Sequence, residues 1–266
     1  MKRVRRTGVR EGRCPVRITL DPEYWDRVAD NAIPVHPLMA AYKRHEHVTL
    51  IRKWLGMQGK IVLKTDCYEE ANGDDGFLDW LAGQSRRAIG VDISPRIARK
   101  ARGRFPTVSF TAGDVRTLPF KDASLDAIVS NSTLDHFPTS DLITSLHEFH
   151  RVLKQGGMMV LTLDNKDNPM KFLFYNFANK AGLMPYHRER CYSLRETSQL
   201  ARRAGFKVLD HAAIVHMFLP INTLRRVLPL RLHDLLTRAL VPCFKVVAAL
   251  PTRQFTGCFV AVLCEK

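Results

Sequence analysis

Short apolar runs alternate with amphipathic stretches through the middle of the chain. Each run is long enough for one buried strand, and we expect strands over residues 60–65, 87–91, 108–111, 125–130 and 158–163. Helices are expected between the strands. The helix after 87–91 has a clear start, because Ser94 followed by Pro95 is favourable at a helix N-terminus. Strands that alternate with helices predict an α/β fold with a doubly wound, mostly parallel sheet.

The segments around this core have different patterns. Residues 1–22 carry Gly, Pro and Arg without periodicity and are expected to form a loose basic arm. The remainder, 23–266, is expected to form a single domain. We divide this domain into N-terminal cap helices at 23–56 with a break at 34–37, the alternating core at 57–165, a segment at 166–218, an apolar and basic insert at 219–254, and the last strand at 255–266.

Polar side chains follow four of the apolar runs, three of them directly and the fourth after two further residues. They are Asp66, Asp92, Asp114 and Asn131. Asp and Asn favour turns for local reasons, but ligands of doubly wound sheets bind at the carboxyl ends of the strands. Four such residues in succession therefore favour a shared binding site at this edge of the sheet.

The spacing of these residues resembles the class I S-adenosylmethionine-dependent methyltransferases, and within them the UbiE-like, type 11 group. The resemblance covers roughly residues 48–165. It is carried by GVDIS at 90–94, GDVRTLPF at 113–120, LDAIV at 125–129 and HRVLKQGG at 150–157. It implies a Rossmann-like sheet of seven strands with N-terminal helices, a helical insert before the last strand, and residues 166–218 on the substrate side. The implied cofactor is S-adenosyl-L-methionine, and the implied product is S-adenosyl-L-homocysteine.

The resemblance also implies cofactor roles for residues after the second and third strands. Asp92 matches the acid that binds both ribose hydroxyls, a task for which a carboxylate is suited because it accepts two hydrogen bonds at once. Ile93 would pack beside the adenine ring. Asp114 would accept a hydrogen bond from the adenine amino group, and the backbone of Val115 would lie near a ring nitrogen.

The first motif of the family, V-L-D-x-G-x-G-x-G, is altered in this chain. The aligned stretch, 62–70, is VLKTDCYEE. All three glycines are replaced, and Lys64 stands where the family has an acid. Because glycine lets the backbone turn tightly beside a ligand, we expect this chain to turn later, at 72–73 or at Gly76.

Two interpretations of this altered loop are open. In the first, the loop is rebuilt, so that Asp66 or Glu69 holds the cofactor's ammonium group while Lys64 pairs with an acid or with the cofactor's carboxylate. In the second, the site has lost its cofactor and the domain is a non-catalytic scaffold. The intact Asp92 and Asp114 favour the first. Lys64 can also be read as a buried structural partner of Asp66 or Asp92.

Candidates for catalysis and substrate binding follow from the same resemblance. Methyl transfer is an in-line displacement, so the protein aligns the acceptor and, for a hydroxyl, removes its proton. His136 lies just beyond the fourth strand and is the candidate base, because histidine titrates near neutral pH. Ser130 and Asn131 match the segment beside the methionine part of the cofactor. The candidate substrate-binding residues are Tyr42, Tyr186 and His187.

Basic residues are concentrated in two segments of the chain. The formal net charge is +15, and residues 1–13 hold six bases against one acid, as do residues 219–254. The insert also has leucines that suit one helical face, with breaks at Pro229, Pro242 and Pro251. Contact of 1–13 and 219–254 with an anionic membrane surface is one interpretation, and a lid or a dimer contact is the other. Nucleic acid is disfavoured, because Phe244 is the only aromatic residue of the insert.

We therefore expect methylation of a small or lipid-like molecule at oxygen, since the N-P-P-Y tetrapeptide of many amino-group methyltransferases is replaced by SNST at 130–133. An RNA methyltransferase is a further alternative, suggested by net charge alone. No stretch approaches the ~18–20 apolar residues of a spanning helix. The six cysteines lack CxxC spacing, so we expect no metal and a cytoplasmic protein, with or without peripheral membrane contact. The sequence leaves the oligomeric state open.

Overall fold

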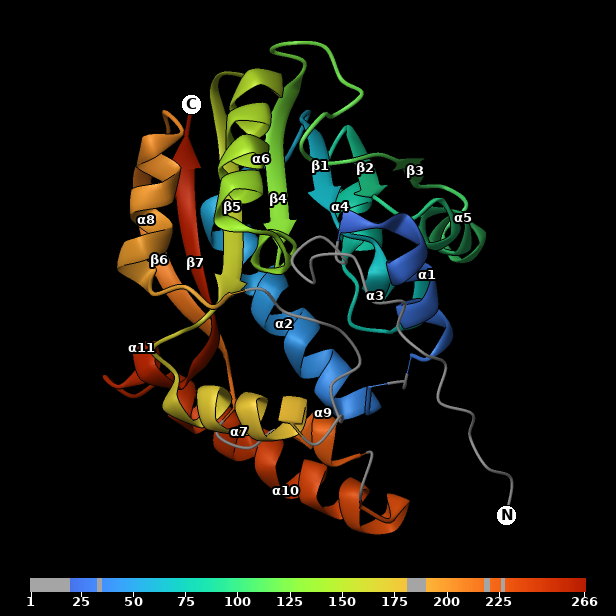
Figure 1. The fold of residues 1–266 in the computed structure, drawn as a ribbon, viewed down its shortest axis with the longest axis vertical. Coiled ribbons are helices and arrows are strands. Elements are labelled where there is room, and N and C mark those ends of the chain that lie inside the picture. The colour runs from blue at the N-terminus through green and yellow to red at the C-terminus, as the bar shows by residue number, and fades with distance from the viewer. Residues whose placement is uncertain (1–19, 33–34, 181–189, 218–220, 226–227) are drawn as a thin grey trace.

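A computed structural model describes residues 20–32, 35–180, 190–217, 221–225 and 228–266. Seven strands form one sheet (Figure 1). Their order across the sheet is β3 (Ser109–Ala112), β2 (Arg87–Asp92), β1 (Ile61–Thr65), β4 (Leu125–Asn131), β5 (Leu153–Asp164), β7 (Gly257–Glu265) and β6 (Lys207–His216). Neighbouring strands from β3 to β5 are parallel, and β7 is antiparallel to both β5 and β6. The predicted Rossmann-like, mostly parallel sheet of seven strands is confirmed.

Burial explains why the central strands are almost continuous apolar runs. Strand β1 has the sequence IVLKT, and its last four residues are buried, because helices cover both faces of a parallel sheet. Its register places Thr65 beside Val91 of β2 and Ser130 of β4. The three strands therefore end at the same edge, and this brings the residues that follow them together.

Helices cover the sheet on both faces. The helices before α6 are α1 (Pro22–Asp30), α2 (Pro37–Trp54), α3 (Tyr68–Asn72), α4 (Leu78–Gln84), α5 (Pro95–Arg104) and the short 3-10 helix η2 (Leu134–His136). The later ones are α6 (Thr139–Val152), α7 (Pro169–Lys180), α8 (Leu194–Arg203), α9 (Ile221–Leu224), α10 (Leu230–Ala248) and α11 (Arg253–Thr256). Buried side chains of α2, α4, α5 and α10 belong to one core, and those of α6 and α8 belong to the core on the opposite face.

Local sequence accounts for several helix starts. Ser94 accepts a hydrogen bond from the Ile97 N–H at 2.9 Å and caps α5, with Pro95 at its first position as predicted. Asp21 caps α1 in the same way, and Ser193 forms a capping box at α8. α1 ends at Asp30 and α2 begins at Pro37, at the end of the break that we expected at 34–37.

Two expectations about the helices were wrong. The expected break at Pro242 is absent, and α10 continues through this residue. Proline removes one helical hydrogen bond, but Val241 and Phe244 on either side are buried, and their packing holds the helix together. The leucines of the insert also do not share one face, because Leu235 is 64% exposed whereas Leu236 packs against the core. Among the described helices, none is long and apolar enough to cross a membrane.

Candidate functional site

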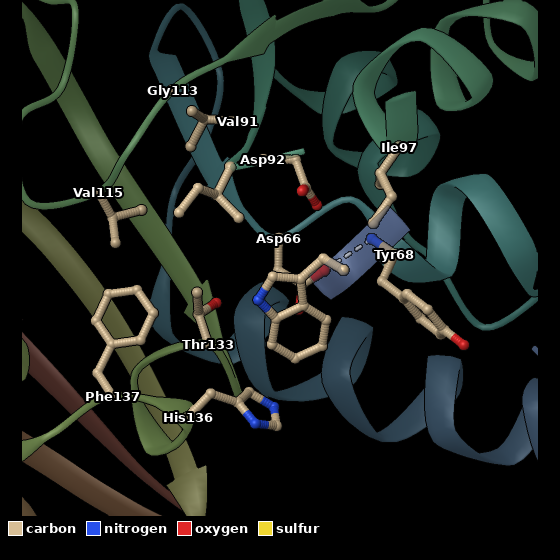
Figure 2. A pocket seen from close by; sticks show the side chains of 12 residues that line it. Asp66, Tyr68, Val91, Asp92, Ile97, Gly113, Val115, Thr133, His136 and Phe137 are labelled. Carbon is tan, nitrogen blue, oxygen red and sulfur yellow. Dashed lines mark hydrogen bonds between the residues drawn. The ribbon is translucent and has the colours of Figure 1, made fainter. Parts of the chain in front are cut away.

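A cleft of about 450 Å³, partly open to solvent, lies at the carboxyl ends of β1, β2 and β4 (Figure 2). The lining residues are Trp25, Asp66, Tyr68, Val91, Asp92, Ile93, Ile97, Gly113, Val115, Thr133, His136 and Phe137. The structure thus brings together five of the residues selected from the sequence: Asp66, Asp92, Ile93, Val115 and His136.

Asp66 makes the turn that a glycine would make in the first motif. It occupies the position of the first glycine and has a φ of 67°, in the left-handed region that aspartate tolerates better than most residues. Its carboxylate accepts a hydrogen bond from the Tyr68 N–H at 2.7 Å, and its own N–H donates to the Val91 carbonyl at 2.9 Å. The expectation of a later turn was wrong, because this local hydrogen bonding stabilises the turn at Asp66. The short helix α3 follows directly.

Lys64 does not line the cleft. Its ammonium donates to Glu70 at 2.9 Å and to the Asp66 carbonyl at 2.5 Å, and both side chains of the ion pair are fully buried. The second oxygen of Glu70 accepts the N–H groups of Phe77 and Leu78 at the start of α4, each at 3.1 Å. Lys64 therefore has the geometry of a structural partner, and its acid is Glu70 rather than Asp66 or Asp92. Glu70 stands where the family has its third glycine.

Carboxylates dominate the polar part of the cleft. Asp92 accepts backbone N–H groups from Cys67 at 2.9 Å and Ser94 at 2.8 Å, yet burial raises its pKa to about 6. Burial, together with Glu69 and Asp92, also raises the pKa of Asp66. One buried oxygen of Glu69 has no hydrogen-bond partner within the described part of the chain. Since no Lys or Arg lines the described cleft, it suits a ligand with positive charge and hydroxyl donors.

Apolar side chains form the wall next to Asp92. Val91, Ile93, Ile97 and Val115 face the cleft. Gly113 lines the same wall, and a Cβ at this position would approach the Val91 side chain to 3.2 Å. A glycine here keeps the wall flat. Figure 2 shows Val91, Ile97 and Val115 around Asp92, as a flat aromatic ring bound beside a ribose would require.

Asp114 lies next to this wall but is not among the lining residues. Its carboxylate accepts hydrogen bonds from the Arg116 guanidinium at 2.6–3.1 Å, and Arg116 also binds Asp141 at 3.1 Å. The predicted bond to an adenine amino group would therefore have to coexist with this ion pair, and it stays a prediction.

Ser130 and Asn131 end β4 as buried residues behind the cleft. Ser130 accepts a hydrogen bond from Thr65 at 3.1 Å, and Asn131 accepts one from Thr162 at 3.1 Å. Both residues thereby hold β4 to its neighbouring strands. The residue of this segment that reaches the cleft is Thr133, whose hydroxyl is 2.8 Å from that of Thr65. Thr133 was not among the predicted site residues, although it lies only two residues after Asn131.

His136 and Trp25 meet at the mouth of the cleft. Their ring centroids are 4.9 Å apart in an edge-to-face arrangement. Trp25 belongs to α1, which is attached to the start of α5 because Ser94 donates a hydrogen bond to Asp26. In Figure 2, Asp66 lies between Asp92 and His136. Trp25 was also not among the predicted site residues, and its only sequence signal is its place in a capped helix of the N-terminal segment.

Tyr42 is the one candidate substrate-binding residue within the described part of the chain, and it does not line the cleft. Tyr42 is buried between α2 and β6, where its hydroxyl accepts the His216 N–H at 2.9 Å and donates to the His216 carbonyl at 3.3 Å. Burial raises the pKa of this phenol. Tyr186 and His187 lie outside the described residues.

Comparisons with known proteins show what the chain is similar to. A family described as "Methyltransferase domain" matches residues 70–161. A Mycolicibacterium smegmatis protein named as a probable S-adenosylmethionine-dependent methyltransferase is 29% identical over 66% of this chain and 62% of its own length. A Coxiella burnetii malonyl-[acyl-carrier protein] O-methyltransferase is 36% identical over 59% of this chain and 56% of its own length. The matched part thus spans less than two thirds of either relative.

A solved structure shares the fold over nearly the whole chain. It is described as a complex between the Haloferax volcanii Trm112 methyltransferase activator and "the putative methyltransferase". The TM-score is 0.60 at 17% identity, and the alignment covers 93% of this chain and 96% of that one. The family match, the relatives and the strand order agree with one another. Residues 70–161 therefore match a methyltransferase domain, and the chain has the fold of the class I methyltransferases, whose cofactor is S-adenosylmethionine.

Proposed function

We propose that the chain transfers the methyl group of S-adenosylmethionine to an oxygen atom of a small or lipid-like acceptor. The observation that carries this proposal is the convergence of Asp66, Asp92 and the apolar wall in one cleft. The cofactor would supply a methyl carbon attached to a positively charged sulfur. The O-methyltransferase name of the Coxiella burnetii relative supports oxygen as the methylated atom.

The residues of the cleft fit the parts of this cofactor. Asp92 uses one lone pair on each oxygen for its backbone partners, and the remaining lone pairs can accept ribose hydroxyls. The wall around Ile93 and Val115 suits the adenine ring. Asp66 is the lining carboxylate that can accept a hydrogen bond from the cofactor's ammonium, whereas Glu69 is not among the lining residues. The altered first motif is thus proposed to be a rebuilt loop rather than a lost site.

Calorimetric titration tests the cofactor part of this proposal. We expect the purified chain to bind S-adenosylmethionine with one site, because the acidic cleft provides acceptors for its hydroxyls and its positive charge. Titration with adenosine alone is the matched control and should bind more weakly, since it lacks the ammonium and the sulfonium. No heat of binding at millimolar S-adenosylmethionine would contradict the proposal and favour the scaffold interpretation.

His136 is the proposed base for a hydroxyl acceptor. It is 7% exposed and faces the cleft, where it can accept the acceptor's proton while the oxygen gains the methyl group. In His136→Gln we expect methylation of a phenol and fatty-acid panel to fall by roughly 10²–10⁴-fold. Cofactor affinity should stay unchanged.

The matched control is His45→Gln, because His45 is exposed on α2. The pH–rate profile separates a base from a positioning residue. In the wild type, the methylation rate should fall at low pH as the base becomes protonated. In His136→Gln this fall should be absent. An unchanged profile, or an equal loss of cofactor binding, would contradict the assignment of a base.

A further inference from the structure

Helix α10 has a buried face that attaches it to the rest of the molecule. His233, Thr237, Val241 and Phe244 are buried, and the helix packs against α2 and β6. Asp234 accepts a hydrogen bond from His36 at 2.8 Å, which ties the first turn of α10 to the start of α2. The orientation of α10 is therefore defined by its own core contacts.

The opposite face of α10 is apolar and exposed. Leu232, Leu235 and Val246 are 44%, 64% and 65% exposed. With 3.6 residues per turn, these positions and Ala239 fall on one stripe, which lies opposite the buried stripe of Thr237 and Val241. Among the described residues, the hydrophobic core does not include this second stripe, so α10 has an exposed apolar side opposite its buried one.

Helix α7 presents a similar stripe at the same end of the molecule. Met170, Leu173 and Phe177 follow helical spacing and are 38%, 62% and 66% exposed. The short helix α11 contacts both α7 and α10, and its Phe255 is 51% exposed. The three helices lie together below the sheet in Figure 1. We call these exposed side chains of α7, α10 and α11 the apolar end face.

Basic residues border the apolar stripe of α10. Arg231, Arg238 and Lys245 are exposed and seven residues apart, so they form a line along one edge of the stripe. The only acid in the segment 219–254 is Asp234, which is engaged by His36 and by Arg238. An exposed apolar stripe with a basic edge is typical of helices that lie in a membrane interface.

We propose that the apolar end face docks on an anionic lipid bilayer, with Arg231, Arg238 and Lys245 at the level of the headgroups. A second copy of the chain is the weaker occupant, because a symmetric contact would bring the same basic edges together. The carboxyl ends of β1, β4 and β5 point toward this end of the molecule (Figure 1). Docking would therefore place the cleft on the membrane side. The proposal does not depend on the nature of the reaction.

Vesicle co-sedimentation of the full chain tests this proposal. We expect binding to phosphatidylcholine vesicles that contain phosphatidylglycerol, weaker binding to phosphatidylcholine alone, and a loss of binding at high salt. The double variant Leu232→Glu/Leu235→Glu should weaken binding by roughly tenfold or more, because it removes two apolar side chains from the interface. Leu209→Glu is the matched control, since Leu209 is 43% exposed on β6, outside the apolar end face.

Each other outcome would overturn the proposal. Absence of sedimentation with either vesicle would reject a membrane surface. Equal sedimentation of the wild type and the double variant would show that another part of the chain makes the contact. Light scattering tests self-association as the alternative. If the wild type does not bind vesicles but forms a concentration-dependent dimer, and the double variant does not, the apolar end face is a self-association surface.

Discussion

Lys64→Met is expected to lower the free energy of unfolding by about 3–5 kcal/mol. Lys64 and Glu70 are both fully buried, and their charged groups are 2.9 Å apart. Burial by itself lowers the pKa of Lys64, but Glu70 and the neighbouring carboxylates outweigh it, and the pKa is raised. The ammonium therefore stays charged. Without it, Glu70 would remain as a buried carboxylate with no cation.

Denaturant unfolding of three variants measures this effect. Lys53→Met is the matched control, because Lys53 is 72% exposed and its ion pair with Asp210 is on the surface. The double variant Lys64→Met/Glu70→Leu should be more stable than Lys64→Met, because it no longer contains a buried charge without a partner. The Phe77 and Leu78 N–H groups would still lose their acceptor, so recovery should be incomplete. A loss below about 1 kcal/mol in Lys64→Met would show that the ion pair does not support the loop.

Asp92→Ala is expected to weaken binding of S-adenosylmethionine by roughly 1.5–3 kcal/mol, the range for hydrogen bonds to a charged group. Asp92 is 7% exposed in the cleft, and the backbone of Cys67 and Ser94 fixes its two oxygens. The matched control is Asp74→Ala, because the Asp74 side chain is 74% exposed. Calorimetry gives the affinities, and thermal unfolding shows whether each variant is folded. Unchanged affinity in Asp92→Ala would contradict the assignment of the ribose site.

The pH dependence of binding has a definite sign. Burial raises the pKa of Asp92 to about 6, so this carboxyl is increasingly protonated below pH 6. A positively charged cofactor favours the ionised form, and binding should therefore release protons near pH 6. Affinity should fall as the pH decreases through this value, by up to about tenfold per pH unit for one titrating group. Asp92→Asn cannot ionise at this position, and its affinity should vary less between pH 5 and pH 7.

The rebuilt first motif shows which features the local sequence predicts and which depend on the folded turn. The loss of three glycines was visible in the sequence, but it did not show how the chain would turn. Asp66 adopts a φ of 67° at the position of the first glycine, stabilised by its own hydrogen bond to Tyr68. Glu70 could not be paired from spacing, because its partner Lys64 lies on a strand and Glu70 on the helix after the turn. Only the folded turn brings these two charges together.

The sequence by itself determined the order of strands and helices, the parallel core and the meeting of Asp66 and Asp92 at one edge. These follow from short-range patterns, namely the length of the apolar runs and the position of polar residues after them. The tertiary structure alone decided which residues reach the cleft. Trp25 and Thr133 line it, whereas Lys64 and Tyr42 do not.

The two apolar faces of α10 show the same division between local pattern and packing. An apolar pattern indicates which side chains avoid water, but it does not indicate which face of a helix packs against the rest of the chain. Val241 and Phe244 pack against the body of the protein, while Leu232 and Leu235 remain exposed. That choice depends on contacts with α2 and β6, which are distant in the sequence. Burial is thus a property of the assembled fold, and local periodicity determines only which side chains can share a face.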